Sequence, residues 1–274
     1  MTRDIRLILS DIDGTILDSQ HQLDSGLFDV ITDLKESSIP FILASARSPQ
    51  GIFPIVEELN LADSPIAAYN GALIVEGKKE DYQILIEHGL NKSDVKRILD
   101  LLAVNYPHIS VNIYSGSDWM ATQLDRWVEI EAAITKENPQ LIEVATLLED
   151  SSKPIHKLLL IAETEEIQDF FTDLQEIPFE DTSFYLSKDN YLEVTSQSVS
   201  KENALLEMAN YYQVPLEETM AIGDNFNDLP MLTLAGLGVA MGNAPEAVKQ
   251  GADCITLSNL EQGASKAIKL HVLD

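Results

Sequence analysis

Short apolar runs alternate with amphipathic stretches toward both ends of the chain. The apolar runs have the length of strands and lie at residues 7–10, 41–44, 66–69, 219–222, 238–240 and 254–256. The stretches between them carry apolar residues at helical spacing, at residues 26–37, 49–59, 201–212, 228–235 and 244–250. Strands that alternate with helices are typical of a parallel sheet with helices on its faces. We therefore predict an α/β fold whose ligands bind at the carboxyl ends of the strands.

The middle of the chain has a different pattern. Predicted strands lie at residues 82–86, 109–114, 157–162, 182–186 and 191–194, around predicted helices at residues 93–106, 124–136 and 165–174. Charged, turn-like segments at residues 76–81 and 187–190 flank this region. We therefore predict a Rossmann-like parallel-sheet core domain formed by residues 1–81 and 190–274. Residues 82–189 would be inserted into it as an α+β domain.

Composition narrows the class of protein. The chain has 274 residues, of which 45% are hydrophobic, which is ample for a packed core. With 18 basic and 45 acidic residues its formal charge is −27, so we expect it to repel nucleic acid and anionic membranes. No run approaches the roughly 18 apolar residues of a membrane span, and we expect no signal peptide. The single cysteine, Cys254, excludes a disulfide within the chain, and we expect a cytoplasmic location.

Two acidic residues at the end of the first apolar strand are the first candidates for chemistry. Asp11 and Asp13 are two positions apart and precede Gly14. Residues i and i+2 of a strand point to the same side, so the two carboxylates would converge. Like charges so close repel unless a cation lies between them, which indicates a divalent metal such as Mg²⁺. The alternative is a solvated acidic turn, which the apolar strand before the pair and Gly14-Thr15 after it make less favourable.

Three further polar segments follow predicted strands or begin a predicted helix. Residues 44–47 offer the Ser45 hydroxyl and small neighbours, which let backbone N–H groups approach a phosphate. Residues 198–201 end in Lys201 at a helix start, where a point cation can meet phosphate charge. Residues 223–228 crowd acids and amides into one turn. Each has a plain structural explanation alone: a turn hydroxyl, a solvated lysine, and acids that favour a helix start.

In order and spacing these segments resemble the haloacid dehalogenase superfamily of phosphatases, and within it the Cof-type hydrolases, which have a large α/β (type IIB) cap. Residues 11–15 (Asp-Ile-Asp-Gly-Thr) resemble the first motif, Ser45 the second, Lys201 the third and residues 223–228 the fourth. The resemblance extends over essentially the whole chain, with the cap between the second and third motifs. Residues 45–47 (Ser-Ala-Arg) depart from the threonine and glycine that are more usual there, for which we expect altered phosphate fit with activity retained.

The resemblance implies a Mg²⁺-dependent phosphatase that acts on small phosphorylated metabolites through an aspartyl phosphate. Asp11 would be the nucleophile and Asp13 the general acid and base. The implied metal ligands are Asp11, Asp13 through its backbone carbonyl, Asp224 and Asp228. The implied phosphate-binding groups are the N–H groups near Ile12 and Ala46, the Ser45 hydroxyl, Lys201 and the Asn227 amide. The inserted cap would choose the leaving group, with candidate contacts from Tyr114, Asp118, Trp119 and Arg126.

Several alternatives remain open. A phosphomutase would use the same phosphoaspartate, and a phosphometabolite-binding regulator would retain the site without turnover. A receiver-like signalling module is disfavoured, because it needs neither the large insertion nor a general acid two residues beyond the nucleophile. Arg47 either contacts substrate or forms a surface ion pair, and we leave it outside the catalytic set. The substrate is expected to be a sugar phosphate or a phosphorylated cofactor or precursor, and the oligomeric state is not predicted.

Overall fold

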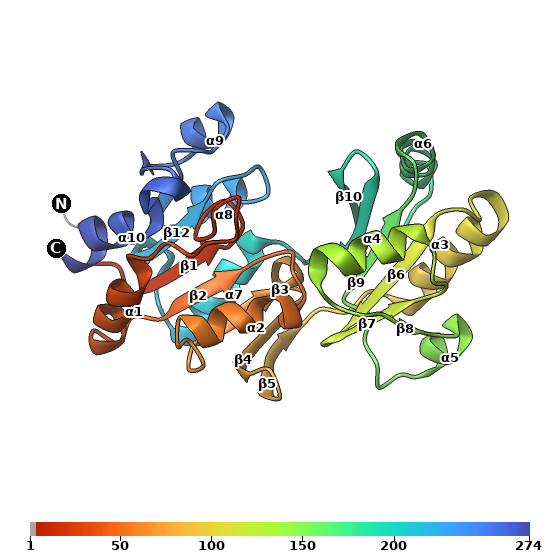
Figure 1. Ribbon diagram of the computed structural model, residues 1–274, viewed down its shortest axis with the longest axis horizontal. Helices are drawn as coiled ribbons and strands as arrows, with labels where there is room; N and C mark the ends of the chain where they lie inside the picture. The colour runs from red at the N-terminus through yellow and green to blue at the C-terminus, as the bar shows by residue number, and fades with distance from the viewer. Residues whose placement is uncertain (1–3) are drawn as a thin grey trace. The chain divides into compact units, whose positions relative to one another are not determined.

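The computed structural model describes residues 4–274, which form two compact units (Figure 1). The core unit comprises the chain up to Arg47, then Ile52–Ile86 and Ser200–Asp274. The inserted unit comprises Ser48–Gly51 and Glu87–Val199. Each unit has its own sheet, and the predicted α/β fold is confirmed. Among residues 4–274, no helix is both long enough and apolar enough to cross a membrane.

The core unit is built on an eight-stranded sheet. Its strand order is β14-β13-β12-β1-β2-β3-β4-β5, and the pairs from β14 to β3 are parallel. The strands are β1 (Leu7–Asp11), β2 (Phe41–Ala44), β3 (Ile66–Ala68), β4 (Leu73–Lys78), β5 (Asp81–Glu87), β12 (Thr219–Gly223), β13 (Leu237–Ala240) and β14 (Cys254–Ile255). Every residue of β1 is buried, as expected for a central parallel strand that is covered on both faces.

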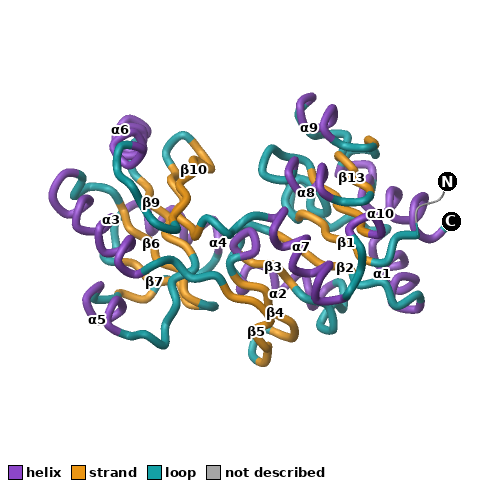
Figure 2. Tube along the Cα trace, turned by 180° about the vertical axis from the view of Figure 1, so that it is seen from behind, coloured by secondary structure: helices purple, strands orange, loops and turns teal. Residues whose placement is uncertain are grey.

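Helices cover both faces of this sheet. They are α1 (Leu27–Glu36), α2 (Pro49–Glu58), α7 (Lys201–Tyr212), α8 (Leu229–Leu234), α9 (Glu246–Gly251) and α10 (Gly263–Ile268). Helix α2 lies in front of the sheet in Figure 1, and α7 lies in front of it in the reverse view of Figure 2. Leu7 and Leu9, which share one face of β1, pack in a buried cluster with Leu205 and Met208 of α7. The sheet is therefore enclosed, and its open places are the strand ends.

The inserted unit has a six-stranded sheet in the order β10-β11-β9-β6-β7-β8. Its elements are α3 (Lys92–Asn105), β6 (Ser110–Ser115), β7 (Asp118–Ala121), α4 (Arg126–Thr135), β8 (Gln140–Leu141), α5 (Val144–Glu149), β9 (Lys157–Ile161), α6 (Thr164–Gln175), β10 (Thr182–Lys188) and β11 (Tyr191–Ser196). Val111 and Ile113 of β6 pack with residues of α3 and α6 in one apolar cluster. Residues that alternate with Val111 and Ile113 along β6, such as Asn112 and Tyr114, therefore lie on the other face of the sheet.

The boundaries between the units differ from the predicted ones. Residues 82–86 were expected in the inserted domain, but β5 is the edge strand of the core sheet. Only two residues, Lys79 and Glu80, connect β4 to β5, so β5 pairs with the strand just before it. At the other side, residues 190–199 were expected in the core, but β11 lies between β10 and β9. The inserted unit therefore extends to Val199, because β11 fills a central place in its sheet.

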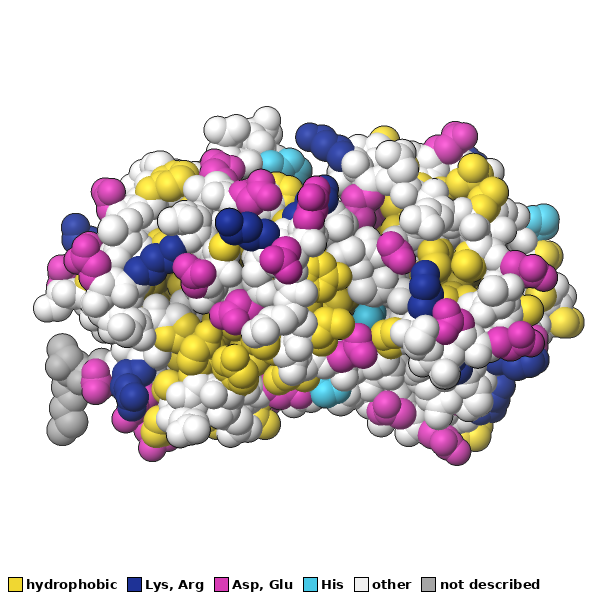
Figure 3. Space-filling model, turned by 90° about the horizontal axis from the view of Figure 1, so that it is seen from below, with side chains coloured by type: hydrophobic (Ala, Val, Ile, Leu, Met, Phe, Trp, Pro, Cys, Tyr) yellow, Lys and Arg dark blue, Asp and Glu magenta, His cyan; other side chains and the backbone are white. Residues whose placement is uncertain are grey.

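One face of the molecule shows how charged side chains are distributed there. On the face shown in Figure 3, acidic side chains are spread over the surface and basic ones lie among them. The field at long range is set by the sum of these charges, which is strongly negative. An anionic ligand would therefore have to be attracted by local groups near its binding site.

Candidate active site

Three carboxylates from two neighbouring strands meet at the carboxyl end of the core sheet. Asp11 is the last residue of β1, while Asp224 and Asp228 follow β12. The two strands are parallel neighbours with Ser10 opposite Ile222, so they end side by side. Carboxylate oxygens of the three residues lie within 4.8 Å of one another. Asp11 and Asp228 are buried, and Asp224 is partly exposed.

The backbone around this cluster leaves no room for larger residues. Gly14 has φ +87°, a left-handed conformation, and a Cβ atom there would lie 2.4 Å from Oδ2 of Asp224. At Gly223 a Cβ atom would lie 2.5 Å from Cβ of Asp228. Thr15 Oγ1 donates to Oδ1 of Asp224 at 3.0 Å. The glycines of the first and fourth motifs thus let the acidic side chains approach one another.

Asp228 holds the loop that carries Asp224. Its Oδ2 accepts hydrogen bonds from the backbone N–H groups of Asp224 and Asn225, each at 2.9 Å. Its Oδ1 accepts one from Lys201 Nζ at 2.6 Å. Because both oxygens are occupied, Asp228 links the loop after β12 to the start of α7.

Lys201 is the cation inside the cluster. It is the first residue of α7, its side chain is 2% exposed, and it donates to Oδ1 of Asp11 as well as to Asp228. The preceding Ser200 caps the helix, since its Oγ accepts from Asn203 N at 3.0 Å. The cap fixes where α7 begins and so places Lys201 against the end of β1.

The electrostatics of the cluster show a shortage of positive charge. Burial raises the pKa of Asp11 to about 8, although Lys201 opposes that shift. Burial, and then the negative charge of Asp228, raise the pKa of Asp224 to about 6. Burial by itself would lower the pKa of Lys201, but Asp11 and Asp228 raise it above its ordinary value. One ammonium group therefore does not balance three carboxylates.

This donor set fits a hard divalent cation. Three carboxylates from the ends of two neighbouring strands bring oxygens close together, and oxygen ligands are those that Mg²⁺ prefers. A divalent ion would also offset the excess negative charge around Asp11. The cluster Asp11, Asp224 and Asp228 could accordingly bind a metal ion, as the sequence predicted for these three residues.

Asp13 does not join the cluster through its carboxylate. Its side chain is 48% exposed and binds Arg47, with Nε to Oδ2 at 2.8 Å and Nη2 to Oδ1 at 2.5 Å. The expectation that the Asp11 and Asp13 side chains converge is therefore wrong. The reason is local: β1 ends at Asp11, and Asp13 lies in a turn where it makes an isolated bridge to Leu17. The alternation rule holds only inside a strand. The predicted use of the Asp13 backbone carbonyl stays a prediction.

The other predicted phosphate-binding residues lie around the end of β1. Asp11 pairs with Ala44 across β1 and β2, so Ser45 and Ala46 follow directly beside it. Ser45 is buried, and its Oγ accepts from Arg47 N at 3.2 Å. Ile12 is buried after β1, whereas Asn227 is exposed in the turn after β12. The structure thus places Ser45 and Ala46 next to the strand end that carries Asp11, while Asn227 has an exposed side chain.

Asn243 is a residue of the site that the sequence did not single out for chemistry. Its Nδ2 donates to the Gly14 carbonyl at 2.8 Å and lies 3.5 Å from Oδ2 of Asp224. Its Oδ1 accepts from Asn259 N at 3.0 Å. Asn243 follows β13, the neighbour of β12, so the rule that strand ends of a parallel sheet carry the site also pointed to it.

Comparisons with known proteins agree with this arrangement. A family of haloacid dehalogenase-like hydrolases matches residues 8–268. A Haemophilus influenzae protein that carries the name of a phosphatase is 38% identical over 260 residues, which is 94% of this chain and 95% of that protein. A Bacillus subtilis 5-amino-6-(5-phospho-D-ribitylamino)uracil phosphatase is 27% identical over 98% of this chain and 97% of its own.

Solved structures agree as well. A haloacid dehalogenase-like hydrolase of Bacteroides thetaiotaomicron has a TM-score of 0.84 and 31% identity, covering 97% of this chain and 99% of that one. The predicted family and the prediction of a phosphatase are confirmed. The chain belongs to the haloacid dehalogenase-like hydrolases.

Proposed function

We propose that this phosphatase depends on Mg²⁺ and hydrolyses small phosphorylated metabolites through an aspartyl phosphate on Asp11. The observation that carries the proposal is the environment of Asp11. Its carboxylate is buried at the end of a central strand, shares a cluster with Asp224 and Asp228, and contacts Lys201. A second carboxylate, Asp13, is two residues away in an exposed position.

The chemistry follows from these residues. An oxygen of Asp11 forms a bond to phosphorus while the bond from phosphorus to the alcohol oxygen breaks. Asp13 gives its proton to the departing oxygen, and later takes a proton from the water that attacks the phosphoaspartate. The second attack releases inorganic phosphate and restores Asp11. Covalent catalysis of this kind replaces one difficult displacement by two easier ones.

The approach of a carboxylate to a phosphate brings two anions together. Lys201 offsets part of this repulsion, and the Ser45 hydroxyl and the N–H groups near Ile12 and Ala46 are donors for the phosphoryl oxygens. Mg²⁺, when held by Asp11, Asp224, Asp228 and the Asp13 carbonyl, would supply further positive charge to the same oxygens. Asn227 is proposed as an additional donor at the rim, in keeping with its exposed position.

We also propose that the inserted unit selects the leaving group. Behind the apolar face of its sheet lies a polar and aromatic one, where Lys157 and Glu193 form a buried ion pair at 3.3 Å. Tyr185 donates to Glu193 at 2.7 Å, and Tyr114 stacks on Trp119 with ring centroids 6.1 Å apart. Donors, acceptors and ring faces of this kind suit a hydroxylated or heterocyclic group.

Two of the four cap residues suggested by the sequence lie elsewhere in this unit. Arg126 pairs with Glu163, and Asp118 is 3.5 Å from Lys153, both in exposed positions. Sugar phosphates and phosphorylated cofactor precursors are the proposed substrates. Support comes from the hydrogen-bonding and aromatic side chains of that face and from the Bacillus subtilis relative, which is named for a phosphorylated ribitylaminouracil.

The test is phosphate release from a panel of sugar phosphates, nucleotides, phosphorylated vitamins and the ribitylaminouracil phosphate. We expect release to need Mg²⁺, to stop in chelator, and to fall by more than about 10³-fold in Asp11→Asn, which is more than the loss of a single hydrogen-bond donor. Asp33→Asn, an exposed change on α1, is the matched control and should keep full activity. Release that survives in Asp11→Asn, or transfer of the phosphoryl group to a second substrate without release, would contradict the proposal.

A further inference from the structure

The exposed position of Asp13 is held by one side chain. Both oxygens of its carboxylate accept hydrogen bonds from Arg47, one from Nε and the other from Nη2. This is the two-point arrangement that a guanidinium and a carboxylate favour, and it fixes the plane of the carboxylate as well as its position. Lysine, a single-point cation, could not impose the same orientation.

The backbone of Arg47 is itself fixed by a strained turn. The Arg47 carbonyl accepts from Tyr69 N at 2.9 Å, and the Ser45 carbonyl accepts from Asn70 N at 2.7 Å. Tyr69 and Asn70 both have positive φ, at 52° and 58°, and Gly71 follows at 104°. A non-glycine residue in this region costs about 1–3 kcal/mol, so such a turn persists only where the surroundings demand it. Here it holds residues 45–47 at a fixed place beside the end of β1.

Stability does not account for this arrangement. The Arg47 and Asp13 side chains are 28% and 48% exposed, and exposed ion pairs contribute about 0–1 kcal/mol. What the pair does is keep one carboxylate apart from three others. Asp13 is only two residues from Asp11 in sequence, yet its carboxylate is not part of the cluster of Asp11, Asp224 and Asp228. An acid that binds the metal ion cannot transfer a proton to the leaving group.

We infer that Arg47 is a positioning residue for proton transfer, which holds the Asp13 carboxyl group out of the carboxylate cluster and in one orientation toward the leaving group. The inference rests on the proposed function. In the step concerned, the bond from phosphorus to the alcohol oxygen breaks, and that oxygen takes the proton of Asp13. The phosphoryl group passes to Asp11, and the Asp13 carboxylate that remains accepts both hydrogen bonds of Arg47.

Two substrates with different leaving groups distinguish a role of Arg47 in proton transfer from other roles. An alkoxide must be protonated as it departs, but p-nitrophenolate leaves without help. The parameter kcat/KM reports steps up to the departure of the leaving group, so it is insensitive to the later attack of water. We expect Arg47→Ala to lower kcat/KM for a sugar phosphate by about 10²-fold, as misplacement of a reacting group does. For p-nitrophenyl phosphate kcat/KM should stay near the wild-type value.

The attack of water uses Asp13 as a base for both substrates. With p-nitrophenyl phosphate, kcat and KM of Arg47→Ala should therefore fall together, and a burst of p-nitrophenol should precede the slower steady state. Arg47→Lys should restore part of the lost kcat/KM for the sugar phosphate. Arg6→Ala, which removes another arginine of the core unit from an exposed ion pair with Glu218, should leave kcat/KM unchanged for both substrates. Thermal unfolding of each variant should match the wild type, because exposed ion pairs contribute little stability. Mg²⁺ affinity should match the wild type in Arg6→Ala and should rise in Arg47→Ala, where the released Asp13 carboxylate can join the other three.

Equal losses of kcat/KM on both substrates would overturn the inference, because Arg47 would then act on the phosphoryl group or on the fold. Unchanged kcat/KM for the sugar phosphate would overturn it as well. A wild-type enzyme that releases phosphate from neither substrate, or an active Asp11→Asn variant, would instead refute the proposed function itself.

Discussion

Replacement of Lys201 by methionine tests the buried cluster most directly. The substitution keeps an unbranched side chain of similar length and removes the charge. Lys201, Asp11 and Asp228 have side chains that are 2%, 6% and 1% exposed, so water cannot replace the lost contacts. Loss of one partner from a buried ion pair costs about 3–5 kcal/mol, because the other charge stays buried without compensation.

The structure indicates which carboxylate bears this cost. Oδ2 of Asp228 keeps its two backbone donors, from Asp224 and Asn225, after the lysine is removed. Asp11 loses its cation, but its pKa is already raised to about 8, so it can take up a proton near neutral pH. Protonation of Asp11 reduces the cost of its lost partner to the lower end of the range of about 3–5 kcal/mol. We therefore expect the free energy of unfolding of the core unit to fall by about 3 kcal/mol in chelator.

Mg²⁺ should recover part of this loss. A ligand that binds only the folded state at one hundred times its Kd adds about 2.7 kcal/mol, and removal of Lys201 leaves more negative charge for the cation. The gain in stability on addition of Mg²⁺ should therefore be larger in Lys201→Met than in the wild type. Activity should be lost in the variant at any Mg²⁺ concentration, because the metal does not replace the lysine beside Asp11.

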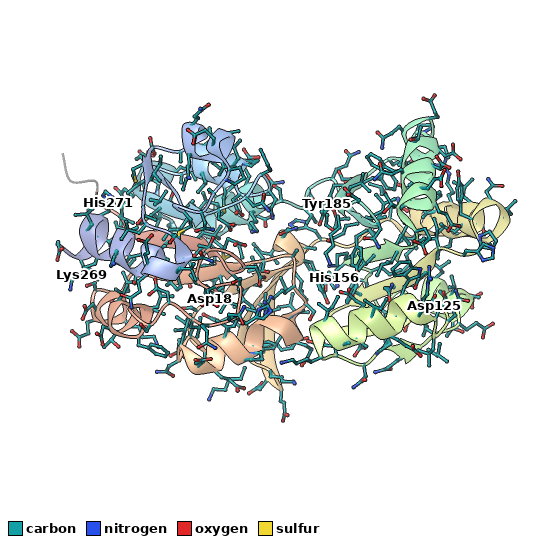
Figure 4. The ribbon with its side chains drawn as sticks, turned by 45° about the horizontal axis from the view of Figure 1, so that its top comes forward. Asp18, Asp125, His156, Tyr185, Lys269 and His271 are labelled. Carbon is teal, nitrogen blue, oxygen red and sulfur yellow. The ribbon has the colours of Figure 1, made fainter. Side chains whose placement is uncertain are left out.

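The assay can separate the two units. Both tryptophans, Trp119 and Trp127, lie in the inserted unit, so their fluorescence reports its unfolding, whereas far-UV circular dichroism reports both units. In urea, we expect Lys201→Met to shift the dichroism transition and to leave the fluorescence transition in place if the units unfold independently. Lys269→Met, at the exposed position labelled in Figure 4, is the control and should shift neither. A loss below about 1 kcal/mol in chelator, typical of an exposed pair, would refute the reasoning.

Three further outcomes are expected. Protons compete with Mg²⁺ for Asp11 and Asp224, whose pKa values are raised to about 8 and about 6. Mg²⁺ affinity, measured by calorimetry, should therefore rise with pH through this range and level off above it. An affinity that does not change with pH would contradict the proposed ligands. Gly14→Ala should weaken Mg²⁺ binding and activity and cost about 1–3 kcal/mol, because its Cβ would collide with Asp224 at a positive φ; unchanged binding would mean that the loop can move. Burial lowers the pKa of His156, and Glu87 opposes this shift. The free energy of unfolding therefore gains a full contribution from the neutral ring above the pKa of the unfolded chain, about 6.5, and loses it as pH falls below that value. In His156→Asn (Figure 4), the decline in stability at low pH, followed by tryptophan fluorescence, should be smaller than in the wild type.

Local pattern predicted the centre of the core sheet well. Strands β1, β2 and β12 lie within a residue of their predicted bounds, because buried parallel strands are short, continuous apolar runs that end in polar turns. The same pattern could not assign β5 and β11 to their sheets. Which of the two sheets a strand joins depends on the partner strands available to it, and those partners can be distant in sequence. Strand β8, Gln140–Leu141, was not predicted, because two exposed residues are too few to form an apolar run or an alternating pattern.

The candidate site shows the same limit at the scale of one side chain. The register of neighbouring strands brought Asp11, Asp224 and Ser45 to one edge of the sheet, and this could be foreseen from where the apolar runs end. The direction of Asp13 could not, since its partner Arg47 is 34 residues away and is held by a turn at Tyr69. No periodicity within residues 11–15 carries that information.

The failure of the alternation rule at Asp13 has a chemical consequence. Had β1 continued for two more residues, Asp11 and Asp13 would share one environment and compete for the same cation. Because the strand stops at Asp11, the first carboxylate is 6% exposed among two acids and a lysine, and the second is 48% exposed against an arginine. Two carboxylates in unlike surroundings can take unlike roles, one as nucleophile and the other in proton transfer. The position at which a strand ends therefore matters to the proposed mechanism as much as the identity of its last residues.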